Sequence, residues 1–129
     1  MGITIAEFQK ALSSLDVSIQ LYHRANPQDP AQKAFRDACI QRFEYCIELS
    51  WKLSLKLLGS TTSAAKPAVR EMARSGIISD PSLWIEFIEA RNSTSHSYDE
   101  EVATKVFRSI EQFLPEARKL EAKLQSLGS

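Results

Sequence analysis

The sequence predicts an all-α protein: one domain over residues 1–129, folded as an up-and-down bundle of about five helices. Apolar residues recur at helical spacing through most of the chain, and almost no segment shows strand-like alternation. The 4 glycines and 5 prolines fall nearly all at the ends of the predicted helices. At 129 residues, 43% of them hydrophobic, the chain is long enough to bury a core without a disulfide or a metal.

The first helix begins after Thr4, because Thr4 and Glu7 have the spacing of a capping box. It ends at Asn26-Pro27. One helix face carries the apolar residues Phe8, Leu12, Leu15, Ile19 and Tyr22. That face is expected to be buried.

The second helix is the longest, with Asp29 as its N-cap, Pro30 in the first turn, and Gly59 after its last residue, Leu58. An inner stripe comprises Phe35, Cys39, Phe43, Cys46, Ser50, Leu53 and Leu57; the apolar surface is widened by Ile40, Ile47, Leu49 and Trp51. A helix apolar over so much of its circumference either lies at the centre of the bundle or faces a second subunit.

The two cysteines, Cys39 and Cys46, are expected to be buried free thiols. They lie seven residues apart in one helix, so their Cα atoms would be roughly 10 Å apart, too far for a disulfide. No further cysteine and no nearby histidine completes a zinc site. Free thiols favour a reducing, cytoplasmic location.

Two shorter helices follow a polar connector at residues 60–65. Pro67 is expected to open the third helix and Gly76 to close it. Asp80-Pro81 opens the fourth, which should fray after Asn92. Trp84 on this helix and Trp51 on the second are expected in the core or an interface.

The last helix is expected to begin near Ser97, where Ser97 and Glu100 repeat the capping-box spacing, and to run to Leu124. Pro115 lies within it. A proline removes one backbone donor, so it should kink or divide this helix.

Bulk charge excludes a general drive toward nucleic acid or acidic membranes, because 16 Lys+Arg balance 16 Asp+Glu. Any anion site must therefore be local. No apolar run approaches the ~20 residues that span a bilayer, and the first residues lack the pattern of a signal peptide. No membrane partner is expected.

Residues 91–100, RNSTSHSYDE, are the segment with the strongest candidates for a functional site, because an arginine, a histidine and a tyrosine surround a polar run. On a continuous helix Arg91 and His96 would point about 140° apart. Ser, Thr and Asn prefer caps and turns, so a break here would bring both side chains onto one surface, with His96 beside a helix N-terminus that favours phosphate. The plainer alternative is an ordinary solvated turn.

The segment contains Arg91, His96 after four further residues, and Tyr98 after one more. This spacing resembles the R-x4-H-x-Y signature of the HEPN superfamily. The chain most resembles its nucleotidyltransferase substrate-binding branch, which includes HepT-type toxins. RDACIQRFEYCIELSWKL resembles that branch's second helix, and REMARSGIISDPSLWIEFIEARNSTSHSYDEE resembles the remainder. The likeness runs from about Ala31 to the C-terminus. The first helix resembles that of the family in general character but not in motif.

The resemblance implies a homodimer with a HEPN-like four-helix core, paired with a separate minimal nucleotidyltransferase. In HEPN nucleases, the residues that match Arg91 and His96 cut RNA without a metal. The residue that matches Asn92 would orient the arginine or hold a phosphate oxygen. The tyrosine that matches Tyr98 is adenylylated by the partner, which silences the nuclease. The chain itself would need no cofactor, since ATP would be used by the partner.

Further candidate contacts for RNA or the partner lie outside this segment. Lys66, Arg70 and Arg74, four residues apart, form a basic ridge on the third helix, although a solvated face explains the same spacing. On the second helix the charged residues are Arg42, Glu44, Glu48 and Lys52. They are expected to form ion pairs along the helix, and the resemblance suggests that some line the same cleft.

Three functions stay open from the sequence. The first is a toxin-type endoribonuclease silenced by a nucleotidyltransferase, which the intact Arg91, His96 and Tyr98 favour. The second is a non-catalytic subunit that binds a nucleotide or presents a substrate to that enzyme. The third is a helical dimer whose motif has lost its role. The chain has neither a Gly-rich phosphate loop nor the paired carboxylates of a nucleotidyltransferase, so it should not transfer nucleotides itself.

Overall fold

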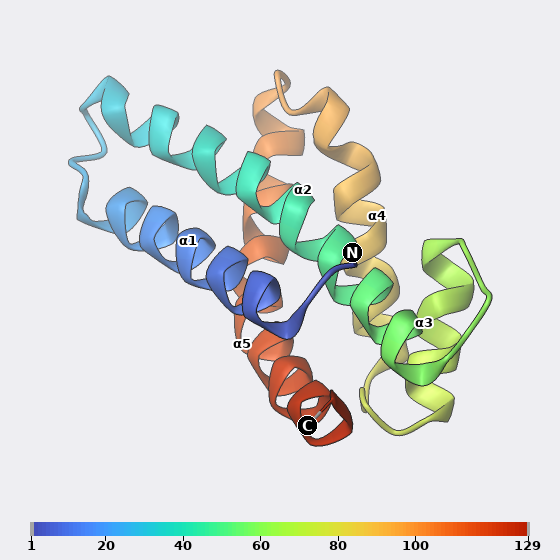
Figure 1. Cartoon of the computed structure of the whole chain (residues 1–129). Coiled ribbons are helices and arrows are strands. Elements are labelled where there is room, and N and C mark those ends of the chain that lie inside the picture. Colours follow the sequence, from blue (N-terminus) through green and yellow to red (C-terminus); the bar gives the residue numbers. More distant parts are fainter. Residues whose placement is uncertain (1, 129) are drawn as a thin grey trace.

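The computed structural model describes residues 2–128 and consists of helices joined by short connections (Figure 1). This confirms the predicted all-α class. The elements are α1 (Ile5–Arg24), α2 (Pro30–Leu58), α3 (Ala65–Arg74), α4 (Pro81–Ser93), a 3₁₀ turn (Thr94–His96) and α5 (Glu100–Gly128).

Helix α2 lies at the centre of the bundle. It packs against α1, α3, α4 and α5, and α1 runs alongside it for most of its length (Figure 1). The residues that widened its apolar surface are all buried within this one chain: Ile40, Ile47, Leu49 and Trp51. Of the two explanations for that surface, the central position therefore accounts for it, and a homodimer remains a prediction on other grounds.

The core contains a cluster of aromatic rings that joins three helices. Phe113 of α5 meets Phe43 of α2 at 5.2 Å between ring centroids, and Phe87 and Trp84 of α4 at 5.4 and 5.7 Å, all edge to face. All four side chains are at most 1% exposed. Edge-to-face geometry places the positive ring edge against the negative face of its neighbour, so the cluster sets the spacing of α2, α4 and α5.

Several expected helix boundaries are confirmed. The Thr4 hydroxyl accepts the amide of Glu7 at 3.1 Å, and Asp29 caps α2 by accepting the amide of Ala31 at 2.9 Å. Gly59 ends α2 with φ +69°, the left-handed conformation that favours glycine.

The expectation for Pro67 was wrong, and one of the two alternatives for Pro115 is ruled out. Helix α3 begins at Ala65, so Pro67 lies within its first turn instead of opening it; the first-turn amides have no acceptor inside the helix, so a proline is tolerated there. Pro115 does not divide α5, which is one helix from Glu100 to Gly128. The flanking residues Phe113 and Ala117 are fully buried, and this packing holds the helix together across the missing hydrogen bond.

Both cysteines are buried free thiols, as expected. Loss of solvation raises the pKa of Cys39, and it raises the pKa of Cys46 to about 12. Trp51 and Trp84 are also buried within the chain, at 7% and 1% exposure.

Candidate functional site

The α-helical structure is interrupted between α4 and α5, as the polar run Asn92–Ser95 predicted. The Ser93 hydroxyl donates to the Glu89 carbonyl at 3.1 Å, and the Ser97 amide bonds the Thr94 carbonyl at 3.1 Å in a 3₁₀ turn. Short hydroxyl side chains compete with the backbone in this way, which explains why α4 ends here. The break follows Ser93, one residue later than expected.

Helix α5 begins later than expected and has a different cap. It starts at Glu100, and Asp99, not Ser97, accepts the amides of Glu101 and Val102 at 2.9 and 3.3 Å. The free amides that were expected to favour a phosphate beside His96 are thus already engaged by a carboxylate. Any phosphate at this site must be held mainly by side chains.

Arg91 points toward α2 and is only 35% exposed. Its Nη1 lies 3.3 Å from Glu44 Oε2, and its Nε lies 3.7 Å from Glu48 Oε1. Lys52 pairs with Glu48 at 3.3 Å, the only one of the ion pairs expected along α2 that forms among the described residues. Two carboxylates and two cations therefore alternate here, so the local net charge is close to zero.

His96 and Tyr98 lie on the outer side of the same turn. Both are exposed, Tyr98 at 85%, and their ring centroids are 6.2 Å apart. Among residues 2–128, no hydrogen bond joins Arg91 to His96. The structure therefore brings the candidate residues to one turn, with the arginine facing inward and the two rings facing solvent.

Thr94 is a site residue that the sequence reasoning missed. Asn92 was expected to orient Arg91 or to hold a phosphate oxygen; its side chain is exposed and makes no hydrogen bond to Arg91 within the described chain. Thr94 is only 6% exposed, and its hydroxyl contacts both Arg91 and Glu44.

One signal in the sequence could have identified Glu44 as the partner of a cation on another helix. Glu44 and Glu48 are like charges one turn apart, an unfavourable spacing on a helix unless a cation from elsewhere lies between them. Arg91 of α4 is that cation.

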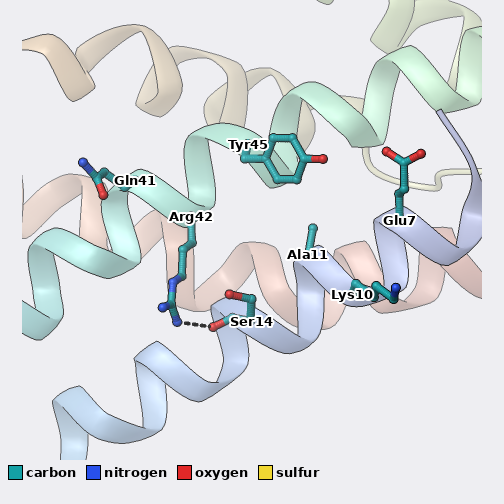
Figure 2. A pocket seen from close by; sticks show the side chains of 7 residues that line it. All are labelled: Glu7, Lys10, Ala11, Ser14, Gln41, Arg42 and Tyr45. Carbon is teal, nitrogen blue, oxygen red and sulfur yellow. Dashed lines mark hydrogen bonds between the residues drawn. The ribbon is translucent and has the colours of Figure 1, made fainter. Parts of the chain in front are cut away.

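Arg42 lies away from this cluster. It is two residues before Glu44, which places it about 200° around α2. Its Nη1 donates to the Ser14 carbonyl of α1 at 2.8 Å. Figure 2 shows it at an open groove of about 470 Å³ between α1 and α2, lined by Glu7, Lys10, Ala11, Ser14, Gln41, Arg42 and Tyr45. The groove is larger than the 360 Å³ hollow between α4 and α5 beside Ser93, but it contains none of the motif residues.

The basic ridge on α3 is only partly available. Lys66 pairs with Glu89 of α4 at 3.4 Å. Arg70 is exposed and has no ion pair among residues 2–128, while Arg74 lines a hollow with Ser60 and Glu71. Arg70 is the member of the ridge best placed to meet an external anion.

A second ionic link holds the start of α5. Arg36 of α2, 10% exposed, donates to both carboxylate oxygens of Glu100 at 2.7 and 3.0 Å, and Lys33 joins at 3.1 Å. The Arg36 guanidinium, with help from Lys33, lowers the pKa of Glu100 to about 2. Helix α2 therefore holds the motif segment at both ends, through Glu44 and through Arg36.

The described chain offers little else of this kind. Over residues 2–128, no group of three or more His, Cys, Asp or Glu is arranged to hold a metal ion. No helix in this part of the chain has the length and apolar character needed to cross a bilayer.

Comparison with known proteins relates the chain to one family. The family described as nucleotidyltransferase substrate binding protein like matches residues 4–126. Over 86 residues, the sequence is 37% identical to a Haemophilus influenzae protein named probable ribonuclease HepT, covering 60% of this chain and 59% of that protein. The chain thus spans less than two thirds of this relative.

Two solved structures share the fold. A Haemophilus influenzae protein described as the substrate binding domain of a nucleotidyltransferase superposes with a TM-score of 0.83 at 30% identity, over 95% of this chain and 99% of that one. A Thermus thermophilus protein superposes with a TM-score of 0.77 at 28% identity, over 91% and 98%. The first of these likenesses, at 30% identity over nearly the whole of both chains, agrees with the family match.

Proposed function

The chain belongs to the nucleotidyltransferase substrate binding protein like family, and we propose that within it this protein is a HepT-type endoribonuclease. It acts without a metal, as a homodimer, and is silenced when a separate minimal nucleotidyltransferase adenylylates Tyr98. The observation that carries the proposal is the turn after α4, which keeps Arg91, His96 and Tyr98 together. The relative named probable ribonuclease HepT supports the same activity.

The reaction proposed is attack of a ribose 2′-oxygen on the adjacent phosphorus. The O2′–P bond forms, the P–O5′ bond breaks, and the products are a 2′,3′-cyclic phosphate and a 5′-hydroxyl. His96 is suited to take the 2′-proton or to protonate the leaving oxygen near neutral pH. Arg91 offers a permanently charged donor to the phosphate as negative charge builds on it.

The reaction needs both a base and an acid, and each motif supplies one histidine. In the proposal, a two-fold dimer places two motifs side by side, so that the two His96 side chains share the roles. RNA would then cross the dimer axis and meet two Arg91 side chains.

Tyr98 is proposed as the point of control. Its phenol is 85% exposed, so a partner enzyme can reach it. The phenol oxygen would form a bond to the α-phosphorus of ATP, with release of pyrophosphate. The added adenylyl group places a bulky anion within reach of His96, whose ring centroid is 6.2 Å from that of Tyr98, and would exclude RNA by charge and by volume.

A second candidate is a non-catalytic subunit that binds a nucleotide or presents a substrate to the nucleotidyltransferase. The specific observation in its favour is that Arg91 is already paired with Glu44 and Glu48, which compete with an RNA phosphate. The solved Haemophilus influenzae protein described as a substrate binding domain supports it as well.

Expression of the chain alone, with cell growth and RNA integrity as readouts, separates the two candidates. Growth arrest with RNA cleavage is expected for the wild type and for His23→Ala, and neither effect for His96→Ala. His23 is a matched control because it is the only other histidine, exposed and bonded to Glu111. Intact RNA with a folded wild-type protein would refute the nuclease, and nucleotide binding by calorimetry would then test the second candidate.

A further inference from the structure

Thr94 is an unusual residue for a turn between helices because it is buried. Its neighbours Asn92, Ser95 and His96 are exposed, whereas Thr94 is only 6% exposed. A buried hydroxyl must find partners inside the protein, or the structure loses the hydrogen bonds that water would provide. The hydrogen bond partners of the Thr94 hydroxyl connect the motif to α2.

The hydroxyl of Thr94 bridges Arg91 and Glu44. Its Oγ1 lies 2.9 Å from Glu44 Oε2 and 2.8 Å from the Arg91 carbonyl, and it accepts from Arg91 Nη1 at 3.4 Å. A hydroxyl has one proton and two lone pairs. The Arg91 carbonyl already accepts the Thr94 amide. The single hydroxyl proton is therefore best used on the Glu44 carboxylate, where the charge strengthens the bond.

This bridge determines which side of the guanidinium is free. Nη1 is engaged by Thr94 and Glu44, and Nε is buried beside Glu48. Nη2 donates no hydrogen bond among residues 2–128 and is not fully buried. Nη2 is therefore the guanidinium nitrogen left to meet an incoming phosphate oxygen, in competition with the nearby carboxylates of Glu44 and Glu48.

The bridge also explains how a long side chain stays in one position. An arginine has many rotamers, and ordering it on binding would lower the rate of a reaction that depends on its placement. Thr94 is attached to the same turn as His96, two residues away. A bond from Thr94 to Glu44 therefore fixes the position of the turn, and with it His96, relative to the guanidinium.

We propose that Thr94 is a positioning residue that holds the Arg91 guanidinium against Glu44 with its Nη2 side open to a phosphate. Its effect on RNA cleavage rests on the proposed function, whereas its effect on the order of Arg91 does not. Thr94 itself touches no reacting atom.

The test compares Thr94→Val, which keeps the shape and removes the hydroxyl, with Thr94→Ser, which keeps the hydroxyl. Thr104→Val is the matched control, because the Thr104 hydroxyl bonds only its own helix, at the Glu100 carbonyl, 2.8 Å away. The first readout is the ¹⁵N relaxation of the Arg91 Nε–H group, identified by its loss in Arg91→Lys. Relaxation typical of a rigid Nε–H group is expected in wild type, Thr94→Ser and Thr104→Val. Relaxation typical of a mobile Nε–H group is expected in Thr94→Val.

A second variant keeps the proposal testable if Thr94→Val fails to fold. Glu44→Met removes the bridge from the α2 side at a position that is 34% exposed. The same mobility of Arg91 is expected there. An Arg91 group as ordered in the folded Thr94→Val or Glu44→Met variant as in wild type would overturn the proposal.

The second readout is the rate of RNA cleavage. Loss of placement is expected to lower kcat by about tenfold to a hundredfold in Thr94→Val with little change in KM, and Thr94→Ser should restore it. Where wild type cleaves RNA, equal kcat for Thr94→Val and wild type would overturn the proposal. If wild type cuts no RNA but Arg91 loses its order in Thr94→Val and keeps it in Thr94→Ser and Thr104→Val, the nuclease fails and the positioning role stands.

Discussion

The ring cluster around Phe113 should be the point at which a single substitution most weakens the bundle. Phe113→Ala deletes a side chain with no exposed surface and three edge-to-face ring contacts. Truncation of a buried Phe costs about 3–5 kcal/mol. Each aromatic pair adds roughly 0.5–1.5 kcal/mol beyond its buried area. With three pairs lost, the free energy of unfolding should fall by about 4–5 kcal/mol, near the top of the truncation range.

Urea unfolding followed by circular dichroism measures this loss directly. For a chain of 129 residues, 4 kcal/mol corresponds to a fall in Tm of about 15 °C. Leu127→Ala, at a side chain that is 48% exposed, is the control and should change stability by less than about 0.5 kcal/mol. A loss below about 2 kcal/mol for Phe113→Ala would mean that the neighbouring rings collapse into the space, and the reasoning would be wrong.

The same cluster connects stability to the site. Phe43 immediately precedes Glu44, and Phe87 lies one turn before Arg91. Rings that hold α2 and α4 at one spacing therefore also hold the carboxylate and the guanidinium within 3.3 Å of each other. Phe113→Ala should thus mobilise the Arg91 Nε–H signal even at temperatures where the chain stays folded.

Three further results are expected. Because Arg36 lowers the pKa of Glu100 from 4.5 to about 2, the ionised carboxylate stabilises the fold above pH 4.5, and this contribution disappears as the pH falls toward 2. The stability difference between wild type and Glu100→Gln should therefore shrink across that window, and a constant difference would refute the link. Cys39 and Cys46, buried and with raised pKa values, should react with a thiol reagent at pH 8 only in denaturant; rapid reaction of the native protein would contradict their burial. Gly59→Ala forces a side chain into a φ of +69° and should cost roughly 1 kcal/mol in urea unfolding, more than Gly59→Asn, whereas equal stability would show that the turn relaxes.

Much of the fold was predictable because local chemistry determines it. Thr4, Asp29 and Gly59 mark helix ends through bonds and angles within a few residues of themselves. The behaviour of the two prolines has the opposite origin. Whether Pro115 divides a helix depends on how firmly the flanking turns are packed, and that packing comes from distant helices.

The site was predictable in part. Arg91, His96 and Tyr98 were chosen as candidates because their spacing resembles a family signature, and the break between them was predicted from the polar residues around Thr94. Their orientations were not predictable, because they depend on which residues of α2 come to face α4. A sequence shows that Glu44 and Glu48 share one helix face, but not which cation completes it.

What the sequence by itself determined is the set of helices, the break after α4 and the chemical groups at that break, since each follows from periodicity, capping and turn preference over a few residues. What only the tertiary structure decided is the pairing: Glu44 with Arg91 and Thr94, and Arg36 with Glu100. These contacts join residues 47 to 64 positions apart, and their geometry is set by the core between the helices. Packing of the whole bundle therefore determines which face of Arg91 is open to a ligand.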